Sequence, residues 1–139
     1  MWFKYMPKIA DNLTQVRRLI QQSASEAGRN PSSITLLAVS KSKTAIDIEE
    51  AYQAGQRDFG ENYAQEAIDK MAQVSHPDII WHFIGPIQSN KSRLIAENFS
   101  WVHTVDRLKI AERLHHQRPS HLSPLQVCIQ VNIDGDDAK

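Results

Sequence analysis

The amino-acid sequence alternates between short apolar segments and longer segments of helical periodicity, and this alternation constrains the fold more than any other feature. The apolar segments have the length of buried strands, and polar or glycine-containing turns follow them closely. Strands are expected at residues 34–39, 57–60, 79–85, 101–105 and 125–133, and helices at residues 8–27, 44–54, 64–71, 90–98 and 108–114. Strands that alternate with helices through short connections predict an α/β fold with a parallel sheet.

Residues that favour helix ends support these boundaries. Thr44 and Asp47 have the spacing of a capping box at the start of the second expected helix. Asn62 and Asp106 precede the third and fifth helices, where we expect their side chains to cap the first turn. Gly55 follows the second helix, and glycine is common where the backbone turns left-handed after a helix.

The last apolar segment, residues 125–133, distinguishes between two parallel architectures. It alternates strictly, with Leu, Val, Ile, Val and Ile on one side and Gln, Cys, Gln and Asn on the other. Strands of an open, doubly wound sheet are apolar on both faces, whereas the inner face of a barrel strand can be polar near a ligand. The alternation therefore favours a TIM-type (β/α) barrel. A closed barrel needs roughly 200 residues or more, so we expect the 139-residue chain to form about the first five strands of a single barrel domain, with residues 1–7 irregular.

Composition and charge argue against several classes of function. The 16 Lys and Arg residues balance 16 Asp and Glu residues, so the chain lacks the positive charge of a typical nucleic-acid binder. No apolar run reaches the roughly 18 residues of a transmembrane helix, and the first residues do not resemble a signal peptide. We therefore expect a cytoplasmic protein without a membrane partner. The single cysteine cannot form an internal disulfide, and the six histidines lack metal-binding spacing, so no metal site is predicted.

Polar residues after the expected strands are candidates for chemistry, because barrel proteins place reacting groups at the carboxyl ends of strands. Lys41 follows the first strand two residues after Val39, so its side chain is expected on the same face as that of Val39. We expect apolar neighbours there to desolvate the lysine stem and to free its amine to attack an aldehyde. Asn62 and His82 lie at the next two strand ends. Each residue has a second interpretation: Lys41 as a solvated loop residue, Asn62 as the helix cap, and His82 as a strand histidine bonded to a neighbouring carbonyl.

Glycines at two of these strand ends indicate positions where the backbone is approached closely. Gly60 and Gly85 have no Cβ, so we expect them to admit a ligand near the main chain. The sequence contains no GxGxxG motif, no P-loop and no Ser-His-Asp order, which leaves dinucleotide, nucleotide and hydrolase functions without support.

Three blocks of the sequence resemble the signature blocks of the pyridoxal phosphate homeostasis proteins, the YggS-like or PROSC family. They are residues 36–43 (LLAVSKSK), 59–66 (FGENYAQE) and 81–91 (WHFIGPIQSNK). The resemblance extends from about Asn12 to the last residue, and Val131-Asn132-Ile133 is similar to the family's fifth strand. The family usually has proline after the second lysine of the first block, where this chain has Thr44.

The resemblance implies a fold like the N-terminal barrel domain of alanine racemase and a pyridoxal 5'-phosphate cofactor. It further implies that Lys41 holds the cofactor as a Schiff base and that Asn62 and His82 lie near it, with Lys43 a second candidate for transient transfer. The implied function is a non-catalytic carrier that maintains cofactor homeostasis and supplies apo-enzymes.

The alternative is a pyridoxal-phosphate-dependent amino-acid racemase. Such an enzyme needs a second acid or base on the opposite face of the cofactor, commonly a tyrosine of another domain; in this chain Tyr63 is the nearest candidate. The phosphate site of a barrel commonly lies after strands seven and eight, and neither is present. We therefore expect the 139-residue chain to be unstable, or to bind the cofactor weakly, without those strands.

Overall fold

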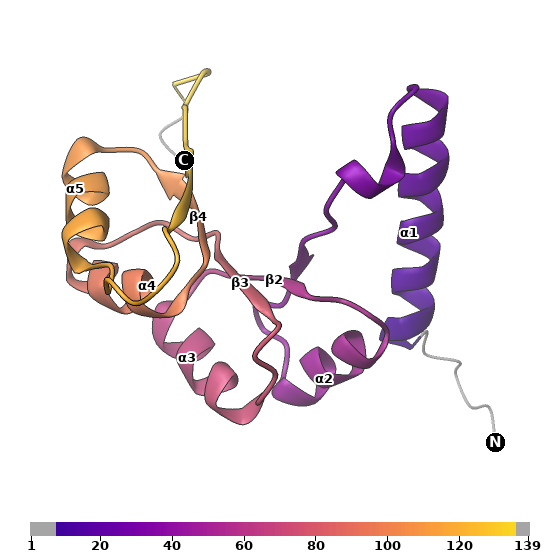
Figure 1. The fold of residues 1–139 in the computed structure, drawn as a ribbon, viewed down its shortest axis with the longest axis horizontal. Coiled ribbons are helices and arrows are strands. Elements are labelled where there is room, and N and C mark those ends of the chain that lie inside the picture. The colour runs from indigo at the N-terminus through magenta and orange to yellow at the C-terminus, as the bar shows by residue number, and fades with distance from the viewer. Residues whose placement is uncertain (1–7, 136–139) are drawn as a thin grey trace.

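The computed structural model describes residues 8–135, in which the apolar segments pair into one parallel sheet. In sequence order the strands are β1 (Ala38–Val39), β2 (Asp58–Glu61), β3 (Ile80–Phe83), β4 (Trp101–Val105) and β5 (Gln126–Ile129), and each pairs with the next. The helices are α1 (Ile9–Glu26), α2 (Ala45–Gln53), α3 (Ala64–Gln73), α4 (Ser92–Asn98) and α5 (Leu108–Gln117), with short 3₁₀ helices at Pro31–Ser33 and Ser89–Lys91. Figure 1 shows the helices as an arc from α1 to α5 with the strands along its inner side. This is the arrangement of part of a (β/α) barrel, so the predicted fold class is confirmed.

The hydrophobic core lies between the sheet and the helices. Phe59, Trp81 and Phe83 on β2 and β3 are buried in this core, whereas Ile80, on the opposite face, is 37% exposed. The helices contribute Ile48, Ile95 and Ile110. We call the face of the sheet that bears Ile80 the inner face. Across residues 8–135, every helix is too short or too polar to span a bilayer.

Three strands are shorter than predicted: β3, which covers Ile80–Phe83 rather than residues 79–85, and the two edge strands, each of which has only one neighbour. β1 covers Ala38–Val39 rather than residues 34–39 and pairs only with β2. Upstream, the Leu36 carbonyl accepts a hydrogen bond from the Gln56 side chain at 2.6 Å instead of from a strand. β5 likewise pairs only with β4 and ends at Ile129 rather than at residue 133. The predicted irregularity of residues 1–7 lies outside the described residues.

The helix ends confirm one predicted cap and contradict two. Thr44 and Asp47 form the capping box: the Thr44 hydroxyl accepts from the Asp47 N–H at 3.2 Å and the Asp47 carboxylate accepts from the Thr44 N–H at 2.8 Å. The predicted caps at Asn62 and Asp106 are wrong, because the N-cap positions of α3 and α5 are Tyr63 and Arg107, and neither helix has a side-chain cap. Asp106 instead pairs with the neighbouring Arg107.

Candidate binding site at the strand ends

Lys41 lies in a β-turn immediately after β1. The Lys43 N–H donates to the Ser40 carbonyl at 3.0 Å and closes this turn, which we call the Lys41 turn (residues 40–43). Lys41 is exposed and has no hydrogen bond or ion pair within residues 8–135, and Val39 beside it is 49% exposed. The expectation that apolar neighbours desolvate Lys41 is therefore wrong for this chain, because the inner face is open here.

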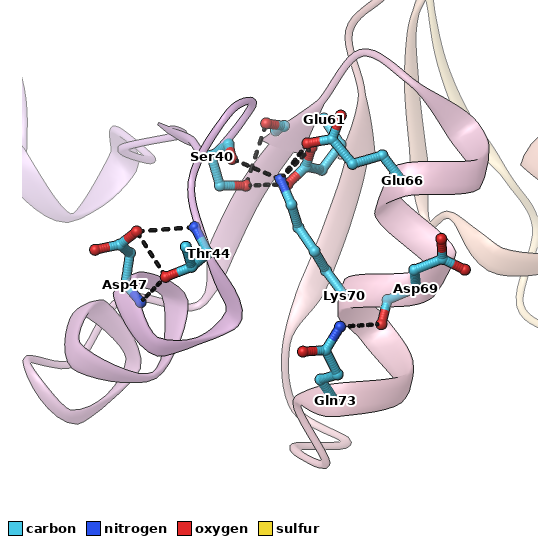
Figure 2. Close-up of polar contacts among 9 residues, drawn as sticks. Ser40, Thr44, Asp47, Glu61, Glu66, Asp69, Lys70 and Gln73 are labelled. Carbon is cyan, nitrogen blue, oxygen red and sulfur yellow. Dashed lines mark hydrogen bonds and ion pairs between the residues drawn. The ribbon is translucent and has the colours of Figure 1, made fainter.

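A buried ionic cluster lies beneath the Lys41 turn (Figure 2). The Lys70 ammonium donates to both Glu61 carboxylate oxygens at 2.9 and 3.2 Å and pairs with Glu66 at 2.8 Å. Ser40 joins the cluster, since its hydroxyl donates to Glu61 at 2.7 Å and its carbonyl accepts from Lys70 at 2.9 Å. Glu61 has no exposed surface, and Lys70 is 6% exposed. Burial alone would lower the pKa of Lys70, but the carboxylates of Glu66 and Glu61 outweigh it and raise the pKa above its ordinary value.

His82 is buried on the inner face and uses both ring nitrogens. Its Nε2 lies 2.9 Å from the Asp58 carboxylate and its Nδ1 lies 2.9 Å from Nε2 of His103. An ionised carboxylate can only accept, so Nε2 of His82 donates to Asp58; when His82 is neutral, its Nδ1 then accepts from His103. The indole of Trp101 stacks on His82, with ring centroids 5.7 Å apart. The interpretation of His82 as bonded to a backbone carbonyl is wrong: its partners are a carboxylate and a second histidine.

Asn62 has an unsatisfied side-chain oxygen. Its Oδ1 is buried without a hydrogen-bond partner in the described chain. A buried acceptor without a donor costs free energy, which a ligand donor would recover. The Asn62 main chain packs against Gly85 so closely that a Cβ at Gly85 would lie 2.3 Å from the Asn62 carbonyl oxygen. Gly85 thus admits a neighbouring strand end, and not a ligand as the sequence led us to expect.

The sheet register brings the candidate residues to one end of the inner face. In the register of the sheet, one residue on each of four neighbouring strands pairs with the next: Val39, Gly60, His82 and Trp101. The residues two positions further on lie closer to the carboxyl ends of the same strands or just past them. We call this the rim layer: Lys41, Asn62, Ile84 and His103. The structure therefore places Lys41 and Asn62 just past the carboxyl ends of the neighbouring strands β1 and β2, and places His82 within β3, where it contacts His103 of the rim layer.

Sequence reasoning missed His103 and Lys70. His103 shares the parity of Trp101 in the strand WVHTV, so its place on the inner face was readable from the alternation. Lys70 continues the three-residue spacing of Ala64 and Ala67, the buried stripe of α3. A lysine on such a stripe signals a buried ion pair, but nothing local identifies its partner.

The His103 network predicts a pH dependence of stability. Burial, followed by the charge of His82, lowers the pKa of His103 from 6.5. The unfolded chain then binds more protons, so this contribution is fully present above about pH 6.5 and is lost as the pH falls through the lower folded-state pKa. We expect the urea midpoint to fall between about pH 8 and pH 5, and to fall less in His103→Asn. The control is His121→Asn, an exposed site outside the network; equal slopes in all three proteins would refute the prediction.

The parallel sheet backed by helices, with a lysine in the turn after its first strand, is part of a (β/α) barrel. Residues 7–136 match the family described as "Alanine racemase, N-terminal domain", and the chain belongs to this family. It is 57% identical over 134 residues to the "Pyridoxal phosphate homeostasis protein" of Pseudomonas aeruginosa, with 96% of this chain and 58% of that protein aligned. The predicted resemblance to these proteins is confirmed, and the chain spans under two thirds of that relative's length.

Solved structures give the same result. PipY of Synechococcus elongatus without PLP superposes with a TM-score of 0.74 at 44% identity, covering 86% of this chain and 56% of PipY. PipY with PLP bound superposes with a TM-score of 0.62 at 48% identity, covering 71% of this chain and 47% of PipY. A protein with the same strand and helix arrangement thus binds this cofactor.

Proposed function

We propose that this chain binds pyridoxal 5'-phosphate as a Schiff base on Lys41 and serves cofactor homeostasis in the cytoplasm as a carrier for apo-enzymes. The observation that carries the proposal is the rim layer, in which the exposed Lys41 amine has no partner in the described chain and Asn62 supplies a buried, unsatisfied oxygen. The PLP-bound PipY and the name of the Pseudomonas relative support the choice of cofactor.

The residues of the rim layer fit the chemistry of this cofactor. The cofactor supplies an aldehyde, which condenses with a lysine amine and releases water. Asn62 Oδ1 is an acceptor for a hydroxyl or N–H donor of the ligand. His82 acts through His103, since both of its own ring nitrogens are occupied. Lys43 is exposed at the far end of the Lys41 turn, which is consistent with a secondary, transient role.

The carrier function is favoured over racemisation by the position of Tyr63. Tyr63 follows Asn62 in extended backbone, with φ −123° and ψ 116°, so its side chain takes the opposite direction from that of Asn62. It is 66% exposed. A tyrosine so placed is a poor acid or base for the opposite face of a ligand in the rim layer.

The test is to incubate the chain with pyridoxal phosphate, reduce it with borohydride and locate the adduct by peptide mass. Reduction makes the linkage irreversible, so even a weak site is recorded. We expect the adduct on Lys41, its loss in Lys41→Ala and its retention in Lys43→Ala. Label spread evenly over exposed lysines such as Lys109 would contradict the proposal. Incubation of the loaded protein with amino acids in heavy water tests the carrier role, since a carrier exchanges the α-proton no faster than the free cofactor.

A further inference from the structure

We propose that Lys70 and Glu66 of α3 are positioning residues that hold the Lys41 turn in the conformation that presents Lys41 for cofactor binding. This inference rests on the proposed function of Lys41. It concerns residues that are 25 and 29 positions away in the sequence and do not touch the Lys41 side chain.

The first anchor fixes the residue that precedes Lys41. Ser40 is 4% exposed and uses all three of its polar groups. Its N–H donates to the Gly60 carbonyl at 2.9 Å, its hydroxyl donates to Glu61 at 2.7 Å, and its carbonyl accepts from Lys70 at 2.9 Å. The bonds to Glu61 and Lys70 involve ionised partners, so they are stronger than hydrogen bonds between neutral groups. The start of the turn is therefore held by α3 as well as by β2.

The second anchor concerns Ser42, the residue that follows Lys41. Ser42 has a φ of +62°, a left-handed conformation that is uncommon for a residue with a Cβ. Such a conformation persists only where its surroundings hold it. The pKa of Glu66 is lowered, mainly by its hydrogen bond to Lys70 and least by the Ser42 backbone N–H, so this carboxylate faces the Lys41 turn. Lys41 thus lies between Ser40, which Lys70 and Glu61 hold by hydrogen bonds, and Ser42, which Glu66 faces.

The two anchors involve residues that lie one helical turn apart on α3. Glu66 and Lys70 are spaced i, i+4 and form an ion pair at 2.8 Å, so each orients the other. Figure 2 shows the Lys70 side chain extending from α3 toward Ser40 and Glu61. The carboxylates that surround Lys70 also keep it protonated. A protonated amine does not attack an aldehyde, so Lys70 positions the turn without competing with Lys41 for the cofactor.

The test compares Glu66→Ala with Glu66→Gln and with Asp69→Ala. Glu66 is 43% exposed and lies at the margin of the cluster, so its removal leaves Lys70 paired with Glu61. Asp69→Ala removes a carboxylate from the exposed face of the same helix, away from the turn. The readout is the share of borohydride-trapped pyridoxyl adduct on Lys41 relative to Lys43, together with the dissociation constant of pyridoxal phosphate. Circular dichroism verifies that each variant is folded.

We expect Glu66→Ala to lower the Lys41-to-Lys43 ratio and to weaken binding by about tenfold, as for a lost hydrogen bond to a charged group. Glu66→Gln should retain most of the ratio, because its amide oxygen can still accept from Lys70, and Asp69→Ala should leave both readouts unchanged. Equal ratios in Glu66→Ala and Asp69→Ala would overturn this inference and leave the proposed function intact. Absence of any preference for Lys41 in the unsubstituted chain would overturn both.

Discussion

Replacing Lys70 with methionine is expected to lower the free energy of unfolding by about 3–5 kcal/mol. The methionine fills similar space but removes the cation that lies 2.9 Å from the fully buried Glu61 carboxylate. An ionised carboxylate without a partner is costly in a water-excluded site, and removing one partner of a buried ion pair therefore costs more than the pair itself contributes. Urea unfolding, followed by circular dichroism at neutral pH, measures the loss.

Two further variants separate charge from packing. Lys109→Met changes an exposed lysine of α5 and should alter stability by no more than about 0.5 kcal/mol. The double variant Lys70→Met with Glu61→Gln removes both charges and should recover most of the loss, because the remaining amide can still bond the Ser40 hydroxyl. A loss below about 1 kcal/mol in Lys70→Met, or no recovery in the double variant, would show that the buried charges do not govern stability here.

The order of strands and helices could be predicted from the sequence because it depends on local periodicity. The segment WVHTV was predicted at residues 101–105 and forms β4 with these bounds. β4 pairs with a strand on each side, so the apolar segment of the sequence and the hydrogen-bonded strand have the same bounds. β1, β3 and β5 were predicted too long because the length of a strand depends on its pairing partners, which the local pattern does not contain.

The site was predictable only in part. Lys41 and Asn62 could be assigned to strand ends, and the strands that they follow, β1 and β2, are neighbours in the sheet. The ionic cluster joins Ser40 to Lys70 across 30 positions, and no local pattern encodes such a contact. Asn62 illustrates the same limit. Its side chain fits a helix cap locally, yet packing against Gly85 holds the backbone so that Oδ1 is buried without a partner.

Gly85→Ala is expected to destabilise the fold by about 1–3 kcal/mol, because the added methyl group has no space. Its Cβ would lie 2.3 Å from the Asn62 carbonyl oxygen and 2.8 Å from the Asn62 Cα. These are main-chain atoms at the end of β2, so the clash cannot be relieved by rotating a side chain. The ends of β2 and β3 must separate, and Asn62 moves with them. We therefore also expect weaker binding of pyridoxal phosphate by the folded fraction.

Gly60→Ala is the matched control for this prediction. A methyl group there would meet Cδ1 of Ile84 at 3.2 Å, the far end of a flexible side chain. Alanine also restricts the unfolded chain, which favours folding by about 0.4–1 kcal/mol where the native backbone accepts it. Gly60→Ala should thus be much less destabilising than Gly85→Ala in thermal and urea unfolding. If the two variants lost equal stability, the close approach of β2 and β3 at Asn62 would not be what requires glycine at position 85, and conformational freedom of the backbone would be the better explanation.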